Sequence, residues 1–129
     1  MYTRFKYTLF LKRSLIMKIA FIIEENLTVY DEHVKAFAKR HDEIIVNRAA
    51  AINQSSREHL RAIGYEISEF STDAQSLGDG LNVEILDGVD KVIFIHYGQS
   101  QSMHELIEYA LRREIPHEVM LLAPIIRIH

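Results

Sequence analysis

The stretch DKVIFIHYGQSQSMHELIEYA (residues 90–110) contains the pattern that decides the fold. Residues 91–95 form a continuous apolar run, as expected for a strand that is covered on both faces of its sheet. A short polar turn with one glycine follows. Ser102 and Glu105 then stand at the spacing of a capping box, which marks the start of a helix. The stretch therefore predicts a buried strand, a tight turn and a helix in direct succession.

The same alternation of strand and helix runs through the rest of the chain. Further apolar or alternating runs predict strands at residues 18–23, 43–46, 65–70 and 118–122, with a candidate edge strand at 124–129. Apolar residues recur at helical spacing in residues 27–39. Ser55 and Glu58 form a second capping-box pair before a helix that stops at Gly64, and residues 81–88 predict a short helix. This order indicates parallel βαβ units with right-handed crossovers. We therefore predict an α/β fold, a Rossmann-like three-layer α/β/α sandwich with a mainly parallel five-stranded sheet.

Length and composition limit the class of protein. The chain has 129 residues, of which 48% are hydrophobic and 26% are charged. These values are typical of one globular domain that buries a real core. The chain has no cysteine, which excludes disulfides, thiolate metal sites and cysteine nucleophiles. No apolar run approaches the roughly 20 residues that a bilayer-spanning helix needs. We expect a cytoplasmic protein without a membrane partner.

Charge is distributed unevenly along the chain. The net charge of −3 argues against strong, sequence-independent binding of nucleic acid. Residues 1–16 nevertheless contain four basic residues and no acidic one. We predict that residues 17–129 form a single Rossmann-like domain and that residues 1–16 are a basic extension. The extension is open to two interpretations, an upstream start or an extra strand or partner-binding arm. A secretory signal is disfavoured because Lys12 and Arg13 interrupt its apolar stretch.

The expected fold selects the candidate site residues. In open α/β sheets, ligands bind beyond the carboxyl ends of the strands, near the point where the strand order reverses. The residues that follow the predicted strands are therefore the candidates. They are Glu24, Glu25 and Asn26, then Asn47 and Arg48, then Ser71, Thr72 and Asp73, and finally residues 96–102.

Two of these segments carry groups that favour an anion. Backbone N–H groups at the start of the helix after residue 95 attract negative charge. Gly98 permits close approach of a ligand there, and Ser100 and Ser102 add hydroxyl donors. The alternative is that Ser102 only caps the helix and Gly98 only makes the turn. Arg48, next to Asn47, can hold a phosphate through its forked donors, or it is an ordinary loop arginine.

Glu105 is the candidate catalytic residue. A carboxylate in the first turn of a helix is ionised and could act as a nucleophile or general base toward a sugar carbon. Its capping role would also explain it fully. His96 and His104 flank the turn, but no HxH, HxxxH or HExxH spacing is present, so we predict no metal site. Neither GxGxxG nor GxxxxGK[ST] occurs, so ordinary dinucleotide and P-loop sites lack their fingerprints and no cofactor is expected.

Residues 82–116 contain the string N-x-E-(x5)-D-K-V-I-F-I-H-Y-G-x-S, followed by I-x-Y-A-(x5)-P. This arrangement resembles the C-terminal half of the YspA-like branch of the SLOG superfamily. The resemblance extends more loosely back to Met17. The matching positions are Asn82, Glu84, Asp90, Gly98, Ser100, Ile107, Tyr109, Ala110 and Pro116.

The resemblance implies a Rossmann-like domain that binds a nucleotide, a nucleoside or a nucleotide-derived small molecule, and a sensory or regulatory module is one form that such a domain takes. Asn82 and Glu84 would then lie with residues 98–102 around the ligand. The superfamily includes phosphoribohydrolases, whose Gly-Gly-x-Gly-Thr-x-x-Glu motif falls on GQSQSMHE. This match implies an alternative N-glycosidase or phosphoribohydrolase activity with Glu105 as catalytic residue. The chain departs from the family at NRAAAINQ (47–54), where the glycines of the phosphate turn are missing. The chain is identified as a degenerate member of the superfamily. The third alternative for its function is a protein-interaction module that binds no ligand, for example one that forms a homo-oligomer.

Overall fold

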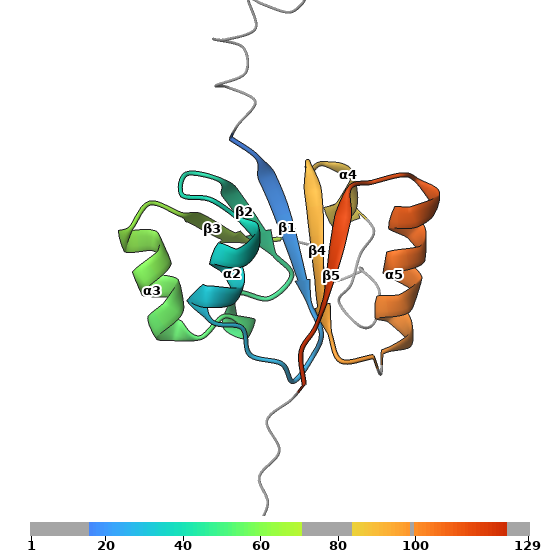
Figure 1. Cartoon of the computed structure of the whole chain (residues 1–129), viewed down its shortest axis with the longest axis horizontal. Helices are drawn as coiled ribbons and strands as arrows, with labels where there is room; N and C mark the ends of the chain where they lie inside the picture. Colours follow the sequence, from blue (N-terminus) through green and yellow to red (C-terminus); the bar gives the residue numbers. More distant parts are fainter. Residues whose placement is uncertain (1–15, 71–83, 99, 124–129) are drawn as a thin grey trace, which may run out of the picture.

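The five predicted strands that lie within the described residues form, and they make one parallel sheet (Figure 1). The computed structural model describes residues 16–70, 84–98 and 100–123. The strands are β1 (Lys18–Ile23), β2 (Glu43–Val46), β3 (Glu66–Glu69), β4 (Lys91–His96) and β5 (His117–Leu121). Their order in the sheet is β3-β2-β1-β4-β5, and every neighbouring pair is parallel. The predicted Rossmann-like α/β fold is therefore confirmed.

Helices cover the sheet on both faces. The helices are α2 (Asp31–Phe37), α3 (Gln54–Ala62), α4 (Glu84–Asp87) and α5 (Gln101–Arg112), with a short 3₁₀ turn, η1 (Ala49–Ala51). Side chains of α2 and α3 pack on one face in a core with Phe21 and Ile44. Side chains of α4 and α5 pack on the opposite face in a second core with Ile22 and Phe94. In Figure 1, α2 and α3 lie beside β2 and β3, while α4 and α5 lie beside β4 and β5.

Burial on both faces of the sheet explains why the central strands appear in the sequence as continuous apolar runs. In β1, Phe21 points to the first core and Ile22 to the second, and neither side chain is accessible to solvent. Successive side chains of a strand point to opposite faces, so a strand covered on both faces needs an apolar residue at every position. Burial of each such side chain contributes about 1.5–3 kcal/mol to stability. The carboxyl ends of β1 and β4 are thereby held rigidly side by side.

Both helix starts differ from the predicted capping boxes. The N-cap of α3 is Asn53, whose side chain accepts a hydrogen bond from the Ser56 N–H at 3.1 Å. The N-cap of α5 is Ser100, whose Oγ accepts from the Met103 N–H at 3.1 Å. Each helix begins earlier than its capping-box pattern implied, so Ser102 already lies in the first turn of α5. The predicted caps are wrong because a polar oxygen nearer the strand reaches the free N–H groups first.

The segment before α2 is buried without being helical. Leu27 and Val29 belong to the first core, although α2 begins only at Asp31. Val29 forms an isolated parallel bridge with Ile52 instead. The helix predicted over residues 27–39 is therefore shorter in the structure. The backbone N–H and C=O groups of Val29 form hydrogen bonds with Ala51 and Asn53 instead of taking part in a helical turn.

Several predictions fall outside the described residues. They concern the basic extension apart from Ile16, the residues Ser71, Thr72, Asp73 and Asn82, and the candidate edge strand at 124–129. Among the residues that the structure does describe, no helix is both long enough and apolar enough to cross a membrane.

Candidate functional site

The strand order reverses between β1 and β4. The chain runs from β1 through β2 to β3 on one side, and then returns to place β4 on the other side of β1. The crevice between the carboxyl ends of two such strands is where open α/β sheets bind ligands. Glu24 follows β1 and His96 ends β4, and each of these residues is only 6% exposed. Two buried ionisable side chains therefore lie at the position where the fold favours a site.

Glu24 and His96 are held by backbone N–H groups of the turn after β4. The Tyr97 N–H donates to Glu24 Oε1 at 3.1 Å, and the Gly98 N–H donates to His96 Nδ1 at 3.1 Å. Glu24 Oε1 lies 3.9 Å from His96 Nδ1. Because Nδ1 accepts a hydrogen bond, the neutral imidazole carries its proton on Nε2. Gly98 has φ +93°, a conformation that favours glycine.

Burial sets the protonation state of His96. Desolvation lowers the pKa of His96, the Glu24 carboxylate raises it, and nearby His104 lowers it again, with a net decrease from the ordinary value. The contact with Glu24 is therefore not an ion pair at neutral pH. Nδ1 already receives the Gly98 N–H, which agrees with an uncharged ring. His96 is thus a neutral donor through its Nε2–H.

Asn47 and Arg48 bind the end of β1. The Asn47 side chain accepts from the Ile23 N–H and donates to the Ile23 C=O, both at 2.9 Å. Arg48 Nη2 donates to the Glu24 C=O at 3.2 Å. Both predicted ligand residues therefore lie beside Glu24 at the strand ends. Their hydrogen bonds lead to the backbone of β1, which positions Glu24.

The serines after β4 are engaged with the start of α5. Ser100 Oγ accepts from the Met103 N–H and lies 3.2 Å from Ser102 Oγ. Both side chains are partly buried. One of the free N–H groups that would attract an anion is thus occupied by Ser100. The segment after β4 therefore caps α5 through Ser100. It also places the first helical turns of α5 next to His96.

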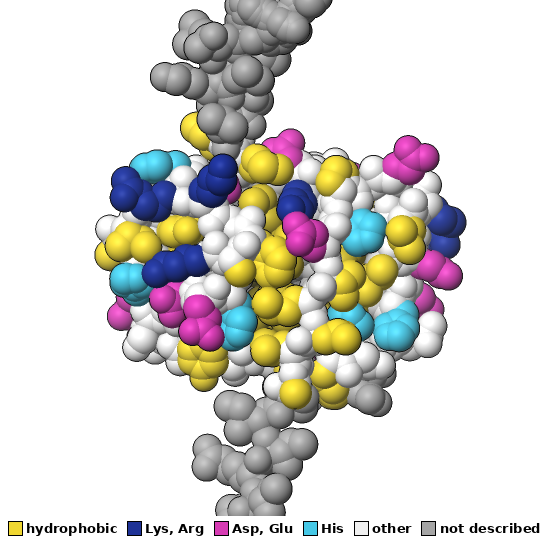
Figure 2. Space-filling model, in the orientation of Figure 1, with side chains coloured by type: hydrophobic (Ala, Val, Ile, Leu, Met, Phe, Trp, Pro, Cys, Tyr) yellow, Lys and Arg dark blue, Asp and Glu magenta, His cyan; other side chains and the backbone are white. Residues whose placement is uncertain are grey.

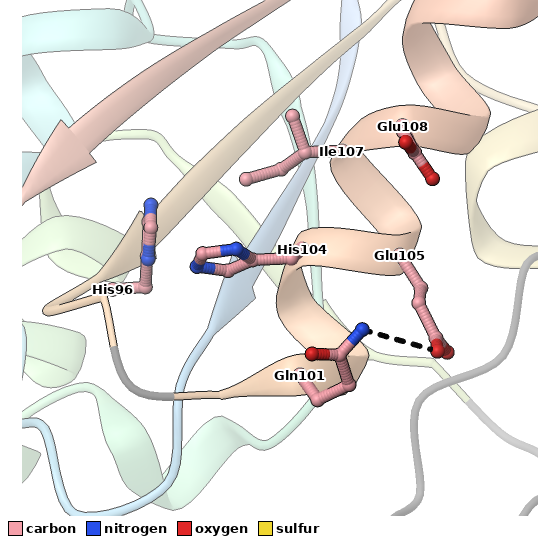
Figure 3. Close-up of a pocket in the computed structure, with 6 residues that line it drawn as sticks. All are labelled: His96, Gln101, His104, Glu105, Ile107 and Glu108. Carbon is pink, nitrogen blue, oxygen red and sulfur yellow. Dashed lines mark hydrogen bonds between the residues drawn. The ribbon is translucent and has the colours of Figure 1, made fainter.

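A pocket of about 390 Å³ opens between the end of β4 and the first turns of α5. Its lining residues are His96, Gln101, His104, Glu105, Ile107 and Glu108 (Figure 3). The His104 ring points toward His96, with ring centroids 5.7 Å apart and an interplanar angle of 83°. Gln101 Nε2 lies 3.5 Å from Glu105 Oε2, at the limit of a hydrogen bond. The sequence pointed to both histidines, to Glu105 and, within residues 96–102, to Gln101, but it did not point to Ile107 or Glu108 as site residues.

The pocket offers hydrogen-bonding groups of both kinds and one apolar wall. His96 Nε2 is a donor, the Gln101 carbonyl and two carboxylates are acceptors, and Ile107 is apolar. Within the described residues, Nε2 has no hydrogen-bond partner, and no fully buried polar side-chain atom lacks one. His96 itself lines the pocket. No lysine or arginine of the described residues lines it.

The structure gathers only part of the predicted site. Gly98, Ser100, Ser102 and Glu105 lie together on the turn and α5, while the Asn47–Arg48 pair lies at the end of β2 beside β1. The backbone of Glu84 begins α4, and the positions of its side chain and of Asn82 are not described. Their implied ligand contacts stay predictions. The described ranges contain no group of three or more His, Asp or Glu residues able to hold a metal ion.

Comparisons with protein-family models, with curated proteins and with solved structures gave no match to this chain. A functional assignment therefore rests on the chemistry of the pocket at His96 and on the arrangement of the strands around it.

Proposed function

We propose that this protein binds a nucleoside-like small molecule in the pocket between the end of β4 and α5. The position of His96 carries the proposal. The residue is only 6% exposed at the carboxyl end of β4, where the strand order reverses, and yet it lines an open pocket. A buried donor with a fixed tautomer and no partner within the described residues is a group arranged for a ligand.

The groups around His96 match the parts of a nucleoside. Nε2–H can donate to a ring nitrogen or carbonyl of a base, and the Gln101 carbonyl can accept from an amino group. Ile107 and the His104 ring supply a wall against which a flat base can lie. Glu105 and Glu108 can accept hydrogen bonds from ribose hydroxyls, the role that acidic residues take in many Rossmann-like sites. The volume of about 390 Å³ falls in the usual range for small-molecule sites.

The charge of the pocket favours a nucleoside over a nucleotide. Two carboxylates line it, and within the described part of the chain no lysine or arginine does. Arg48 is directed to the Glu24 C=O, and Ser100 already occupies the Met103 N–H. A phosphate placed beside Glu105 and Glu108 would meet repulsion without compensation. The SLOG resemblance supports the same ligand class, and the missing glycines of NRAAAINQ agree with a site without phosphate.

A thermal-shift series with the full chain tests this function. Adenosine, guanosine, cytidine and uridine are compared with their 5′-monophosphates and with ADP-ribose. A ligand at about 100 times its Kd stabilises the native state by about 2.7 kcal/mol, so binding raises Tm measurably. We expect a nucleoside to raise Tm more than its monophosphate does. His96→Asn should abolish the shift, whereas His59→Asn, at an exposed histidine of α3, should retain it. The absence of any shift would refute the proposal.

A further inference from the structure

We infer that β5 and α5 form a self-association surface, at which a second copy of this chain adds its own β5 antiparallel to the first. This surface shares Glu108 with the lining of the pocket, but the inference does not depend on ligand binding. It follows from the exposed side chains of β5, from the direction of its free backbone groups, and from the way its sequence matches itself.

Exposed apolar side chains gather at this edge of the molecule. Val119 and Leu121 on β5 are 44% and 71% exposed, and Leu111 on α5 is 60% exposed. Val119 pairs in register with Phe94 and Leu121 with His96, so both point to the face that α5 covers. Figure 2 shows hydrophobic and histidine side chains together between β5 and α5, at the right of the view. Clustered apolar side chains of this kind mark contact surfaces, unlike single exposed ones.

The backbone of β5 offers hydrogen bonds on its outer side. The Leu122 N–H donates to the His96 C=O, and the Pro116 C=O accepts from the Val92 N–H. These even-numbered residues face β4, so the N–H and C=O groups of Val119 and Leu121 point away from it. Among the described strands, none pairs with this outer edge. An edge that no described strand covers, beside exposed apolar side chains, is a template for another strand.

The sequence of β5 is complementary to a second copy of itself. In an antiparallel pair centred on Val119, Val119 lies opposite Val119 of the second copy, and each His117 lies opposite a Leu121. Glu118 lies opposite Met120, and Lys91 already neutralises Glu118 in an ion pair. No like charges therefore oppose one another along the strands. The same surface patch serves both copies, as a twofold interface requires.

The charges of α5 also suit a twofold arrangement. Glu108 and Arg112 form an ion pair one turn apart on α5, 3.6 Å between Oε1 and Nη1. A twofold axis through the paired strands places both α5 helices on the same face of the joined sheet, running antiparallel. Residues of opposite sign on each helix can then face their counterparts across the axis. The exposed side chains of Val119 and Leu121 become the centre of the contact, with the charged residues of α5 at its rim.

The mass of the full chain in solution tests the inference. Sedimentation equilibrium should give twice the chain mass of 15.0 kDa, and the ratio of dimer to monomer should fall on dilution. Val119→Pro removes an outward N–H without touching the bonds to β4, and edge strands tolerate proline. Leu121→Glu places a charge at the centre of the contact. Both variants should sediment as monomers with an unchanged far-UV spectrum, while Ile16→Glu, at a side chain that is 60% exposed before β1, should stay dimeric.

Cross-linking locates the contact. The natural chain has no cysteine, so a single introduced thiol reports on one position only. The Val119→Cys variant should form a covalent dimer with a short bismaleimide, and the matched Glu66→Cys variant, on the opposite edge strand β3, should not. A full chain that is monomeric at every soluble concentration would overturn the inference. So would a dimer that survives Val119→Pro and Leu121→Glu and fails to cross-link through the Val119→Cys variant.

Discussion

Glu24 Oε1 lies 3.9 Å from His96 Nδ1, across the point where the sheet reverses its strand order. The two residues are far apart in the sequence, and the parallel pairing of β1 with β4 brings them together. Backbone N–H groups of Tyr97 and Gly98 fix one atom of each side chain. His96 is therefore presented to the pocket as a neutral donor with one orientation, which makes it the most informative residue to alter.

Acidification is expected to destabilise the fold through His96. Burial lowers the pKa of His96 below its ordinary value of 6.5, which Glu24 only partly offsets. Between the lowered pKa and 6.5 the unfolded chain binds a proton that the folded protein does not. The stability that neutral His96 contributes is therefore complete above pH 6.5 and is lost as the pH falls through the folded pKa.

Urea unfolding of the wild type and of His96→Gln between pH 7.5 and 5 measures this effect. The difference in free energy of unfolding between the two proteins should shrink as the pH falls. His59→Gln, which changes an exposed histidine, should follow the wild type at every pH. A difference that stays constant over this range would show that His96 does not titrate as the burial of its ring requires.

Removal of the Asn47 side chain should weaken the junction of β1 and β2. Asn47→Ala leaves the Ile23 N–H and C=O without their side-chain partner, and we expect a loss of about 1–3 kcal/mol in the free energy of unfolding. Gln54→Ala removes an exposed amide from α3 and serves as the control, with a change within about 0.5 kcal/mol. Chemical unfolding measures both. Unchanged stability of Asn47→Ala would instead favour the predicted role of Asn47 as a ligand residue.

The two serines before α5 should differ in their effect on stability. Ser100→Ala removes the bond to the Met103 N–H, and loss of an N-cap costs about 0.5–2 kcal/mol. Ser102→Ala removes a hydroxyl inside the first turn, where it caps nothing, so we expect a smaller loss. Thermal unfolding of the two variants under identical conditions compares them. A larger loss of stability in Ser102→Ala than in Ser100→Ala would support the capping box that the sequence pattern predicted.

Glu105 should not act as a catalytic nucleophile. Its side chain is exposed, and its hydrogen bond within the described residues is the 3.5 Å contact with Gln101, so no described group shields it from water or holds it firmly in place. We expect nucleosides and nucleoside monophosphates to remain intact during prolonged incubation with the full chain, as measured by chromatography of the free base. Base release that Glu105→Gln abolishes and Glu108→Gln retains would establish the N-glycosidase or phosphoribohydrolase alternative.

Local pattern was sufficient for the strands. KIAFII and EIIV have the same bounds in the structure as in the apolar runs. In KIAFII the last five residues are all buried, because a strand covered on both faces needs apolar residues at successive positions. The helix starts were harder to predict. Asn53 and Ser100 cap α3 and α5, although Ser55 and Ser102 stand at the better motif spacing. A cap depends on where the backbone leaves the preceding strand, which a spacing pattern does not contain.

The sequence by itself determined that the chain alternates strands and helices into a parallel sheet, and which strand ends carry polar residues. The tertiary structure alone decided which of these polar residues meet. The placement of β4 next to β1 joins His96 to Glu24, and the path of α5 turns His104 and Gln101 toward the same pocket. It also left Val119 and Leu121 on an outer edge. These contacts depend on the order of the strands in the sheet, which results from packing between segments far apart in the sequence. The spacing of apolar residues indicates only which face of each segment is buried.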